Sequence, residues 1–539
     1  MVYSLFMLKR FSPLLLSSLS GLLLSAAWLP ACTFLIFLAW IPLLILEDQL
    51  SSDIRVKRPN LSLFGWSSLT FLIWNLLVTW WVAYASLGGA LFAFLGNTLL
   101  MSMVFLIYSA IKKSIGKNYA AWTLLPVWLA WEYGHTLWDL TWPWLSLGNV
   151  FANSTNWVQW YEYTGASGGG AWALCVNLSI FYLLKHNKGL RLWSLPIVRL
   201  ACLIISPVLI SYLILFIKHP MFKKHGGTNV VVVQPNIDPY NTKFSASFRD
   251  QFLKSLELLK GKLNDQTEYL VFPETFITED VNEEDIEGNE AIMLFRDSIC
   301  KHFPKLKVIT GASSYKLYKE QQTTTSRKSE QGFYYDFYNT ALQIDAAGVQ
   351  VYHKSKLVPG VERMPFPALL KPLENLAIDL GGTMGSLGTQ DERTVFKSQA
   401  GGTAVAPVIC YESIYSDYLT AYIRNGANLI FIITNDGWWD DTPGYRQHLS
   451  YAKLRAIETR RDIARSANTG TSCFIDAFGN VRQSTDWWKE AVISSNVHPS
   501  EKITFFVRYG DLISYTASGL SILLVLYSLF GAFRRKKNS

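Results

Sequence analysis

Charged residues are scarce in this chain of 539 residues: only 17% are Asp, Glu, Lys or Arg, whereas 50% are hydrophobic. So apolar a composition is unusual for a soluble protein of this size. The net charge of +8 does not indicate a nucleic-acid surface, because the basic residues cluster in short connections between apolar stretches. The composition therefore predicts a membrane protein with more than one structural unit.

Cysteine and histidine are also rare, at six and eight residues. The cysteines show neither a CxxC pair nor metal-ligand spacing, so the sequence predicts neither a disulfide framework nor a metal site. No HExxH motif is present, and the histidines best placed for catalysis, His353 and His448, lie in no triad motif. We therefore expect chemistry without a metal or a cofactor. The six cysteines are Cys32, Cys175, Cys202, Cys300, Cys410 and Cys473.

Long apolar stretches dominate the first 217 residues and return near the C-terminus. Most reach the roughly 20 residues that a helix needs to cross a bilayer. Basic residues flank every second connection, whereas the alternate connections, including the whole loop 139–162, contain none. This asymmetry predicts eight transmembrane helices, with both termini in the cytoplasm and residues 218–510 outside it. The stretches are 11–29, 31–47, 61–85, 88–110, 119–138, 163–184, 194–217 and 511–533.

Two details of the membrane region leave alternatives open. The first two apolar stretches meet at Leu29-Pro30, as one helical hairpin or as a broken pair. The aromatic-rich loop 139–162 suits the headgroup layer, either as an anchoring belt or as a floor on which acyl chains rest. Gly165 and the run Gly168 to Gly170 would allow close helix packing or a break.

Residues 228–508 alternate between short apolar strands and helical patterns, which predicts a layered α/β sandwich. Polar segments at 278–290 and 318–331 are expected to be surface loops. The first predicted strand opens at Thr228, and the others cover 269–272, 307–311, 340–344, 349–352, 404–409, 429–434 and 471–478. The predicted helices cover 244–263, 411–425 and 446–464.

Three reactive side chains follow predicted strands in this region: Glu274, Lys354 and Cys410. Each alone has an ordinary structural explanation, and a cysteine at a strand end is more often a small buried apolar residue. Together they suit acyl transfer. The thiolate would attack a carbonyl, the carboxylate would carry the proton, and the ammonium with a backbone N–H near Tyr411 would stabilise the oxyanion.

The order Glu, Lys, Cys resembles the triad of the nitrilase superfamily. Nearly the whole chain resembles the membrane-embedded branch of that superfamily, the apolipoprotein N-acyltransferase family. A P-W-L segment at 143–145 and the helix 446–458 also match. The other motifs that carry the resemblance are Q-P-N-I at 234–237, P-E-T at 273–275, K-x-x-L-V-P at 354–359, I-C-Y-E at 409–412 and T-N-D-G-W-W at 434–439.

The resemblance implies a membrane domain over 1–217, a nitrilase-like αββα domain over 218–510, and a transmembrane helix with a basic cytoplasmic tail over 511–539. It implies that an acyl chain moves from a phospholipid to the N-terminal amine of a diacylglyceryl-cysteine apolipoprotein, by ping-pong through a cysteine thioester. The expected location is the bacterial inner membrane, with the catalytic domain facing the periplasm. The expected form is a monomer without a nucleic-acid partner.

By motif position, the resemblance implies three groups of site residues. The family usually reads F-G-E where this chain has Gly360-Val361-Glu362, so the loop that carries the glutamate is expected to differ. The family often has a tryptophan at the position that Phe244 occupies in this chain. The phenylalanine would keep an aromatic ring there but would lack the indole N–H. The implied catalytic residues are Glu274, Lys354 and Cys410, the supporting ones Glu362, Tyr411 and Glu412, and the substrate-binding ones Phe244 and Trp438.

Two other functions are compatible with the same residues. A membrane-anchored amidase or nitrilase would use water as the acceptor, and a lipoprotein-handling protein would use the domain without catalysis. Intact Glu274, Lys354 and Cys410 argue against the second, and the many apolar stretches argue against the first.

Overall fold

The computed structural model describes residues 11–186, 194–222, 227–243, 245–366, 386–398 and 401–538, and its chain divides into two compact units. The first, here called the helical unit, consists of Met1–Trp80, Ala90–Phe216 and Asp511–Ser539. The second, the α/β unit, consists of Trp81–Gly89 and Ile217–Gly510. The segment Trp81–Gly89 thus belongs to the α/β unit, although apolar helices precede and follow it in the sequence.

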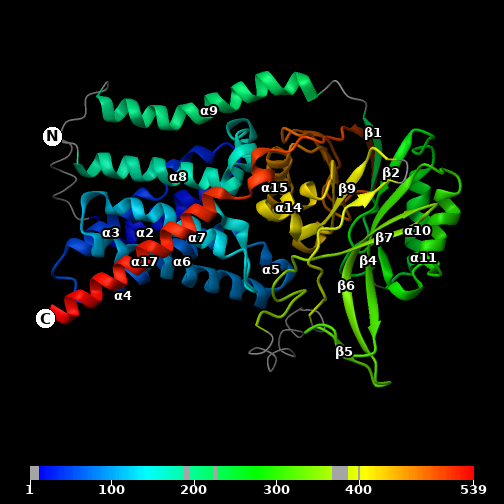
Figure 1. The fold of residues 1–539 in the computed structure, drawn as a ribbon, viewed down its shortest axis with the longest axis horizontal. Coiled ribbons are helices and arrows are strands. Elements are labelled where there is room, and N and C mark those ends of the chain that lie inside the picture. Colours follow the sequence, from blue (N-terminus) through cyan, green and yellow to red (C-terminus); the bar gives the residue numbers. More distant parts are fainter. Residues whose placement is uncertain are drawn as a thin grey trace. The chain divides into compact units, whose positions relative to one another are not determined.

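Within the described residues, the helical unit holds six helical stretches that are long and apolar enough to cross a membrane (Figure 1). One of them, Thr33–Ser52, consists of the 3-10 turn η1 (Thr33–Phe37) and helix α3 (Ile41–Ser52). Apolar side chains lie on all sides of these helices, as expected of segments surrounded by lipid. The other five are α4 (Pro59–Thr79), α6 (Leu87–Ile115), α8 (Tyr161–His186), α9 (Leu195–Phe222) and α17 (Leu512–Asn538).

The predicted number of eight spans is therefore not confirmed. Shorter helices, α2 (Pro13–Ala26) and α7 (Leu124–Gly134), occupy the first and fifth predicted spans. The 14 residues of α2 cover about 21 Å at 1.5 Å per residue, which is less than a hydrocarbon core of about 30 Å. The chain turns after α2, and Ala31 there has a φ of 65°. The 3-10 helix η2 (Asn118–Thr123) leads directly into α7.

The loop 139–162 is packed inside the helical unit and is not an exposed aromatic belt. It forms three short 3-10 helices, and Trp144, Leu147 and Phe151 in it are buried. The ring of Phe151 stacks on that of Trp172 in α8, with 5.1 Å between centroids. Gly165 interrupts α8 with a φ of 63°. The three 3-10 helices are η3 (Pro143–Leu145), η4 (Leu147–Asn153) and η5 (Thr155–Trp157).

Two sheets form the α/β unit. The eight-stranded sheet has the order β14-β1-β2-β4-β6-β5, with β3 paired to β4 and β7 to β6; the six-stranded sheet has the order β13-β12-β11-β10-β9-β8. The first sheet contains β1 (Thr228–Gln234), β2 (Thr267–Val271), β3 (Ile277–Asn282), β4 (Lys307–Tyr318), β5 (Arg327–Lys328), β6 (Tyr334–Asp345), β7 (Gly348–His353) and β14 (Ala491–Val497). The second contains β8 (Phe396–Lys397), β9 (Ala404–Ile409), β10 (Leu429–Thr434), β11 (Ile463–Ala467), β12 (Cys473–Ile475) and β13 (Val481–Ser484).

Helices cover the outer face of each sheet, so the predicted αββα sandwich is confirmed (Figure 1). Helices α10 (Phe248–Leu259) and α11 (Glu290–Phe295) pack on the eight-stranded sheet. Helices α14 (Ser416–Arg424) and α15 (Pro443–Thr459) pack on the six-stranded sheet. Strands β1, β2 and β4 run parallel, as do β9, β10 and β11. Each parallel set therefore brings the residues after its strands to one edge.

The predicted helix 446–464 is too long at its C-terminal end. Helix α15 stops at Thr459, because Arg460 adopts a left-handed backbone with a φ of 51°, and the chain enters strand β11 at Ile463. The strands β3 and β14 were not predicted, since their sequences mix polar and apolar residues. The remaining short helices are α5 (Val82–Ala85), η6 (Glu283–Asp285), η7 (Arg296–Cys300), η9 (Cys410–Ile414), η10 (Asp436–Trp439) and α16 (Phe505–Tyr509).

Candidate active site

The three predicted catalytic residues each follow a strand of the sandwich. Glu274 lies three residues after β2, Lys354 directly after β7, and Cys410 directly after β9. Glu274 and Lys354 are almost completely buried, and Cys410 is partly exposed. Strand β4 approaches the loop that carries Glu274 closely, because a Cβ on Gly311 of β4 would lie 2.3 Å from the backbone nitrogen of Thr275.

Lys354 lies between two carboxylates. Its Nζ donates to Oε1 of Glu274 at 3.0 Å and to Oε1 of Glu362 at 2.8 Å. The amide of Asn339 donates to the same two oxygens, at 2.8 and 3.0 Å. The other oxygen of Glu362 accepts from the backbone N–H of Val358 at 2.8 Å. Glu362 therefore reaches the cluster even though Gly360-Val361 replaces the usual residues of its loop.

Cys410 has a left-handed backbone with a φ of 46°, which is uncommon for a residue with a side chain. Its carbonyl oxygen accepts from the hydroxyl of Ser413 at 2.7 Å and lies 3.1 Å from Nε2 of His448. These contacts hold the strained turn that presents the thiol at the end of β9. His448 therefore contacts the backbone of the cysteine and is not part of a proton-transfer triad.

A second buried ionic cluster supports His448 from behind. Its Nδ1 lies 3.0 Å from Oδ1 of Asp436, and the guanidinium of Arg465 donates to both oxygens of that carboxylate, at 3.0 and 2.7 Å. Burial raises the pKa of Asp436, but Arg465 and His448 outweigh burial and bring it to about 2. Thr434 donates to the same carboxylate at 3.0 Å. Asp436 is therefore an ionised anchor beneath the cysteine turn.

The charges of the first cluster act on the thiol. Burial and the Glu274 carboxylate raise the pKa of Cys410 above its ordinary value, although Lys354 and a hydrogen bond with Thr434 lower it. Burial also raises the pKa of Glu274, but Lys354 and Asn339 outweigh burial and hold it below its ordinary value. Burial lowers the pKa of Lys354, but Glu274 and Glu362 raise it well above the ordinary range. The resting site thus holds a neutral thiol, a carboxylate and an ammonium.

Lys243 is a second buried lysine at this site, and no sequence pattern indicates it. Its Nζ donates to the backbone carbonyl of Glu274 at 3.0 Å. Burial lowers its pKa to about 8, against the opposing charges of Glu274 and Cys410. Asn339 was missed for the same reason, because a single amide in the middle of strand β6 resembles any other polar residue of a strand.

Glu412 organises the turn after Cys410. It is fully buried and accepts from the backbone N–H groups of Ile409 at 2.9 Å and Ser355 at 2.8 Å. The hydroxyls of Tyr352 and Tyr418 donate to its Oε1 at 2.6 and 2.5 Å. Because Ser355 directly follows Lys354, this carboxylate ties the lysine strand to the cysteine strand.

Three aromatic residues complete the predicted site: Tyr411, Trp438 and Phe244. Tyr411 is buried, with its ring 5.4 Å from that of Tyr415. Trp438 in η10 packs edge-on against Tyr240 at 5.3 Å, and its carbonyl accepts from that tyrosine's hydroxyl. Phe244 lies outside the described residues.

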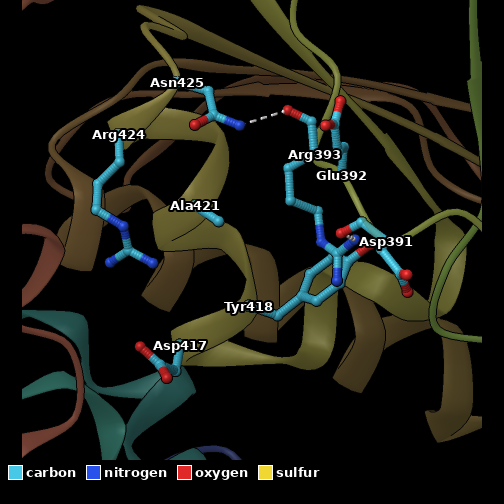
Figure 2. A pocket seen from close by; sticks show the side chains of 8 residues that line it. All are labelled: Asp391, Glu392, Arg393, Asp417, Tyr418, Ala421, Arg424 and Asn425. Atoms are coloured by element: carbon cyan, nitrogen blue, oxygen red, sulfur yellow. Dashed lines mark hydrogen bonds between the residues drawn. The ribbon is translucent and has the colours of Figure 1, made fainter.

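A polar pocket of about 650 Å³ is lined in part by Tyr418, whose hydroxyl donates to Glu412 (Figure 2). Figure 2 shows Arg393 lying along the ring of Tyr418, with 3.9 Å from guanidinium carbon to ring centroid. Asn425 donates to the carbonyl of Arg393 at 2.9 Å. Because acidic and basic side chains both line it, this pocket is unsuited to an acyl chain. Among the described residues, no group of three or more His, Cys, Asp or Glu could hold a metal ion.

Two family sequence models match this chain. The model described as Carbon-nitrogen hydrolase matches residues 229–502, and the model described as Apolipoprotein N-acyltransferase N-terminal domain matches residues 20–179. The first match contains all three candidate catalytic residues. The second falls in the part of the chain that forms the helical unit.

Similar proteins are found along most of the chain. A protein named Apolipoprotein N-acyltransferase from Chlorobaculum tepidum is 29% identical over 526 residues, which cover 95% of this chain and 96% of that protein. One of the same name from Geobacter metallireducens is 26% identical over 417 residues, covering 76% and 74%. Among solved structures, Saccharomyces cerevisiae Nit3 of the nitrilase superfamily has a TM-score of 0.37 at 14% identity, covering 53% of this chain and 95% of that one. An amidase from Nesterenkonia sp. has a TM-score of 0.35 at 14% identity, covering 51% and 93%.

Proposed function

The chain belongs to the carbon-nitrogen hydrolase family and, within it, to the apolipoprotein N-acyltransferases, and from this premise we propose a two-step acyl transfer through Cys410. The protein is a membrane-bound acyltransferase that acylates lipoproteins. The acyl donor is a phospholipid, and the acceptor is the N-terminal amine of a diacylglyceryl-cysteine apolipoprotein. Glu274, Lys354 and Cys410 carry the reaction, with Glu362, Tyr411 and Glu412 in support.

The observation that best supports these roles is the position of Lys354 between two carboxylates, one of which, Glu274, adds to the effect of burial in raising the pKa of the thiol. A lysine so held stays charged and cannot act as a base. Glu274, ionised and hydrogen-bonded on one oxygen, is the group that can accept a proton. We therefore assign the acid–base role to Glu274 and the electrostatic role to Lys354.

In the first half-reaction, the sulfur of Cys410 attacks the ester carbonyl of the phospholipid while its proton passes to Glu274. The resting proton distribution favours the thiol, so proton transfer and carbon–sulfur bond formation are coupled. The charge of Lys354 and a backbone N–H near Tyr411 stabilise the oxyanion. When the carbon–oxygen bond breaks, Glu274 returns the proton to the leaving alkoxide, and a lysophospholipid departs.

In the second half-reaction, the lipoprotein amine attacks the thioester carbonyl. A new carbon–nitrogen bond forms, one amine proton passes to Glu274, and the carbon–sulfur bond breaks. The thiolate then takes the proton back from Glu274, which restores the resting site. Trp438 and Phe244 are assigned to binding the substrates in the two steps. Neither step requires a cofactor.

The membrane topology belongs to the same proposal. We place eight crossings in the membrane, with the shorter α2 and α7 as the first and fifth, in a membrane domain over 1–217 and a last span after residue 511. The catalytic domain 218–510 faces the periplasm of a bacterial inner membrane. Support comes from the basic connections that alternate with connections free of Lys and Arg. The active form is a monomer.

The test is the mass of the intact protein after incubation with a phospholipid. We expect an added acyl group that hydroxylamine removes and that peptide mapping places on Cys410. On addition of a synthetic diacylglyceryl-cysteine peptide, the acyl group should move to the peptide amine. Cys410→Ser should load much more slowly, because a serine hydroxyl is far less acidic than a thiol.

Each rival gives a different result in this assay. An amidase with water as its acceptor would release free fatty acid and leave the peptide unmodified. A non-catalytic protein would never gain the acyl mass. Full transfer activity in Cys410→Ala would disprove the proposed nucleophile.

A further inference from the structure

A cavity of about 250 Å³ opens in the helical unit where the C-terminal ends of α3, α6 and α8 meet. All the residues that line it belong to the helical unit, whereas Cys410 belongs to the α/β unit. The cavity is therefore not part of the candidate active site. Its lining combines basic side chains with an apolar wall.

Two carboxylates in the cavity already have cationic partners. Lys112 pairs with Glu47 and lies 3.2 Å from Oδ1 of Asp48, and Lys185 lies 2.5 Å from the same oxygen. Glu47 also accepts from the hydroxyl of Ser109 at 2.8 Å. These pairs tie the ends of the three helices together, so they form a fixed floor whose charges are balanced.

Two further lysines supply an excess of positive charge. Nζ of Lys113 donates to the neutral amide oxygen of Asn60 at 2.9 Å, and Nζ of Lys117 lies 5.6 Å from the ring centroid of Tyr119. In the described part of the chain, neither forms an ion pair. An anion near Lys113 and Lys117 would therefore meet unbalanced positive charge.

Part of the cavity wall is apolar. Trp122, Leu178 and Phe181 contribute to it, and the ring of Tyr182 packs against that of His186 with 4.5 Å between centroids. Nε2 of His186 is buried and has no hydrogen-bond partner in the described part of the chain. A buried, unsatisfied ring nitrogen is costly unless a ligand or water pairs with it. The cavity therefore offers hydrogen bonding and charge beside a surface that suits an acyl chain.

We propose that this cavity binds the headgroup phosphate of an anionic phospholipid, with one acyl chain along the apolar wall. Basic pockets between membrane helices are suited to anionic headgroups. A free phosphate has the same charge but would leave the apolar wall uncovered. The proposal does not depend on the transfer reaction.

The test uses the full-length protein in detergent and ether-linked lipids, which have no ester to acylate Cys410. Native mass spectrometry would count bound ether-linked phosphatidylglycerol against ether-linked phosphatidylethanolamine. We expect wild type to retain the anionic lipid preferentially, and less of it at high ionic strength. Replacing both Lys113 and Lys117 by glutamine should weaken its binding about tenfold or more, since each lysine near a headgroup contributes to attraction.

Matched variants make the result decisive. Replacing the same two lysines by arginine keeps the charge and should keep binding, which controls for a general loss of structure. Lys260→Gln with Lys301→Gln removes two exposed lysines of the α/β unit and should change nothing. Equal retention of the two lipids, or equal binding by the glutamine variant and wild type, would overturn the proposal. Displacement of the bound lipid by an equal concentration of inorganic phosphate would show a free-phosphate site and overturn the lipid assignment.

Discussion

Lys354 sets the electrostatics of the candidate site at the scale of single residues. Its ammonium is shared by Glu274 and Glu362, and Asn339 donates to both of these carboxylates. Burial and the Glu274 carboxylate raise the pKa of the Cys410 thiol, whereas the charge of Lys354 lowers it. The net result is a raised thiol pKa, so Cys410 is protonated in the resting site.

Removing the proposed base should slow acyl loading strongly while leaving the fold intact. In Glu274→Gln, the amide can still meet Lys354 but cannot take the thiol proton, so we expect acyl loading to slow by about 10²–10⁴-fold. Intact mass against time would measure it. Glu490→Gln, at an exposed ion pair with Lys254, is the matched control and should load normally. In the double variant Glu274→Gln with Cys410→Ser, the two reductions in loading rate should not multiply, because the residues act as a unit. Fully multiplicative reductions would contradict the assignment.

The pH dependence of loading should report on Lys243. Glu274 has a lowered pKa and Cys410 a raised one, so neither changes its protonation between pH 6 and about 8. Lys243, with a pKa of about 8, loses its positive charge above that pH. Because this charge favours a developing thiolate, we expect the loading rate to fall as pH rises through about 8.

Substitutions at Lys243 separate its charge from its packing. Lys243→Arg keeps a positive charge at every pH tested and should remove the fall above about pH 8. Lys243→Met should be slow at all pH values, at the level that wild type reaches when deprotonated. If the loading rate of Lys243→Met still fell above about pH 8 by as much as that of wild type, another group would be responsible for the pH dependence.

At the scale of elements, the segment Trp81–Gly89 supplies a packing surface to the α/β unit. The ring of Trp81 is 1% exposed and lies 4.9 Å from that of Trp439, which in turn packs on His448 at 5.5 Å. Gly444 in the first turn of α15 lies against Trp81, and a Cβ there would be 2.6 Å from the ring. The contact thus reaches the histidine that holds the cysteine turn.

A double-mutant cycle would test this contact. Gly444→Ala should destabilise the protein by about 1–3 kcal/mol, because the buried ring must move, and Trp81→Ala by about 3–5 kcal/mol. In the double variant, the extra methyl group fits the space of the missing ring, so the losses should not add. Thermal unfolding would measure all three. Gly65→Ala, where no atom lies within 4 Å, is the control; additive losses would mean that the two residues do not meet.

Sequence patterns predicted the apolar strands of the sheets better than they predicted which polar residues meet at the candidate site. Strands 404–409 and 429–434 have the predicted bounds, because uninterrupted apolar runs have few other solutions. Strand β11 was missed, because Arg465 within it is buried only through its pairing with Asp436, 29 residues away. Lys243, Asn339 and the carbonyl contact of His448 likewise depend on tertiary neighbours that no local pattern contains.

At the scale of the whole molecule, the distribution of basic residues predicts the orientation in the membrane. Reporter enzymes fused after Lys57 or Lys117 should be active in the cytoplasm, and one fused after Gln321 should be active outside it, because positively charged connections stay inside. Each fusion point lies in a loop, so the spans before it stay intact and the reporter shows on which side of the membrane that loop lies. A cytoplasmic signal at Gln321 would invert the proposed topology.

The chain enters and leaves the α/β unit twice, once for Trp81–Gly89 and once for Ile217–Gly510. A water-soluble fragment that begins at residue 217 would therefore lack a piece of its own core, even though it contains every candidate catalytic residue. Trp439 and Gly444 would then face solvent, and the fragment should aggregate or unfold readily. A synthetic peptide of residues 81–89 added in trans should restore part of the lost stability, much as a missing fragment complements a split enzyme.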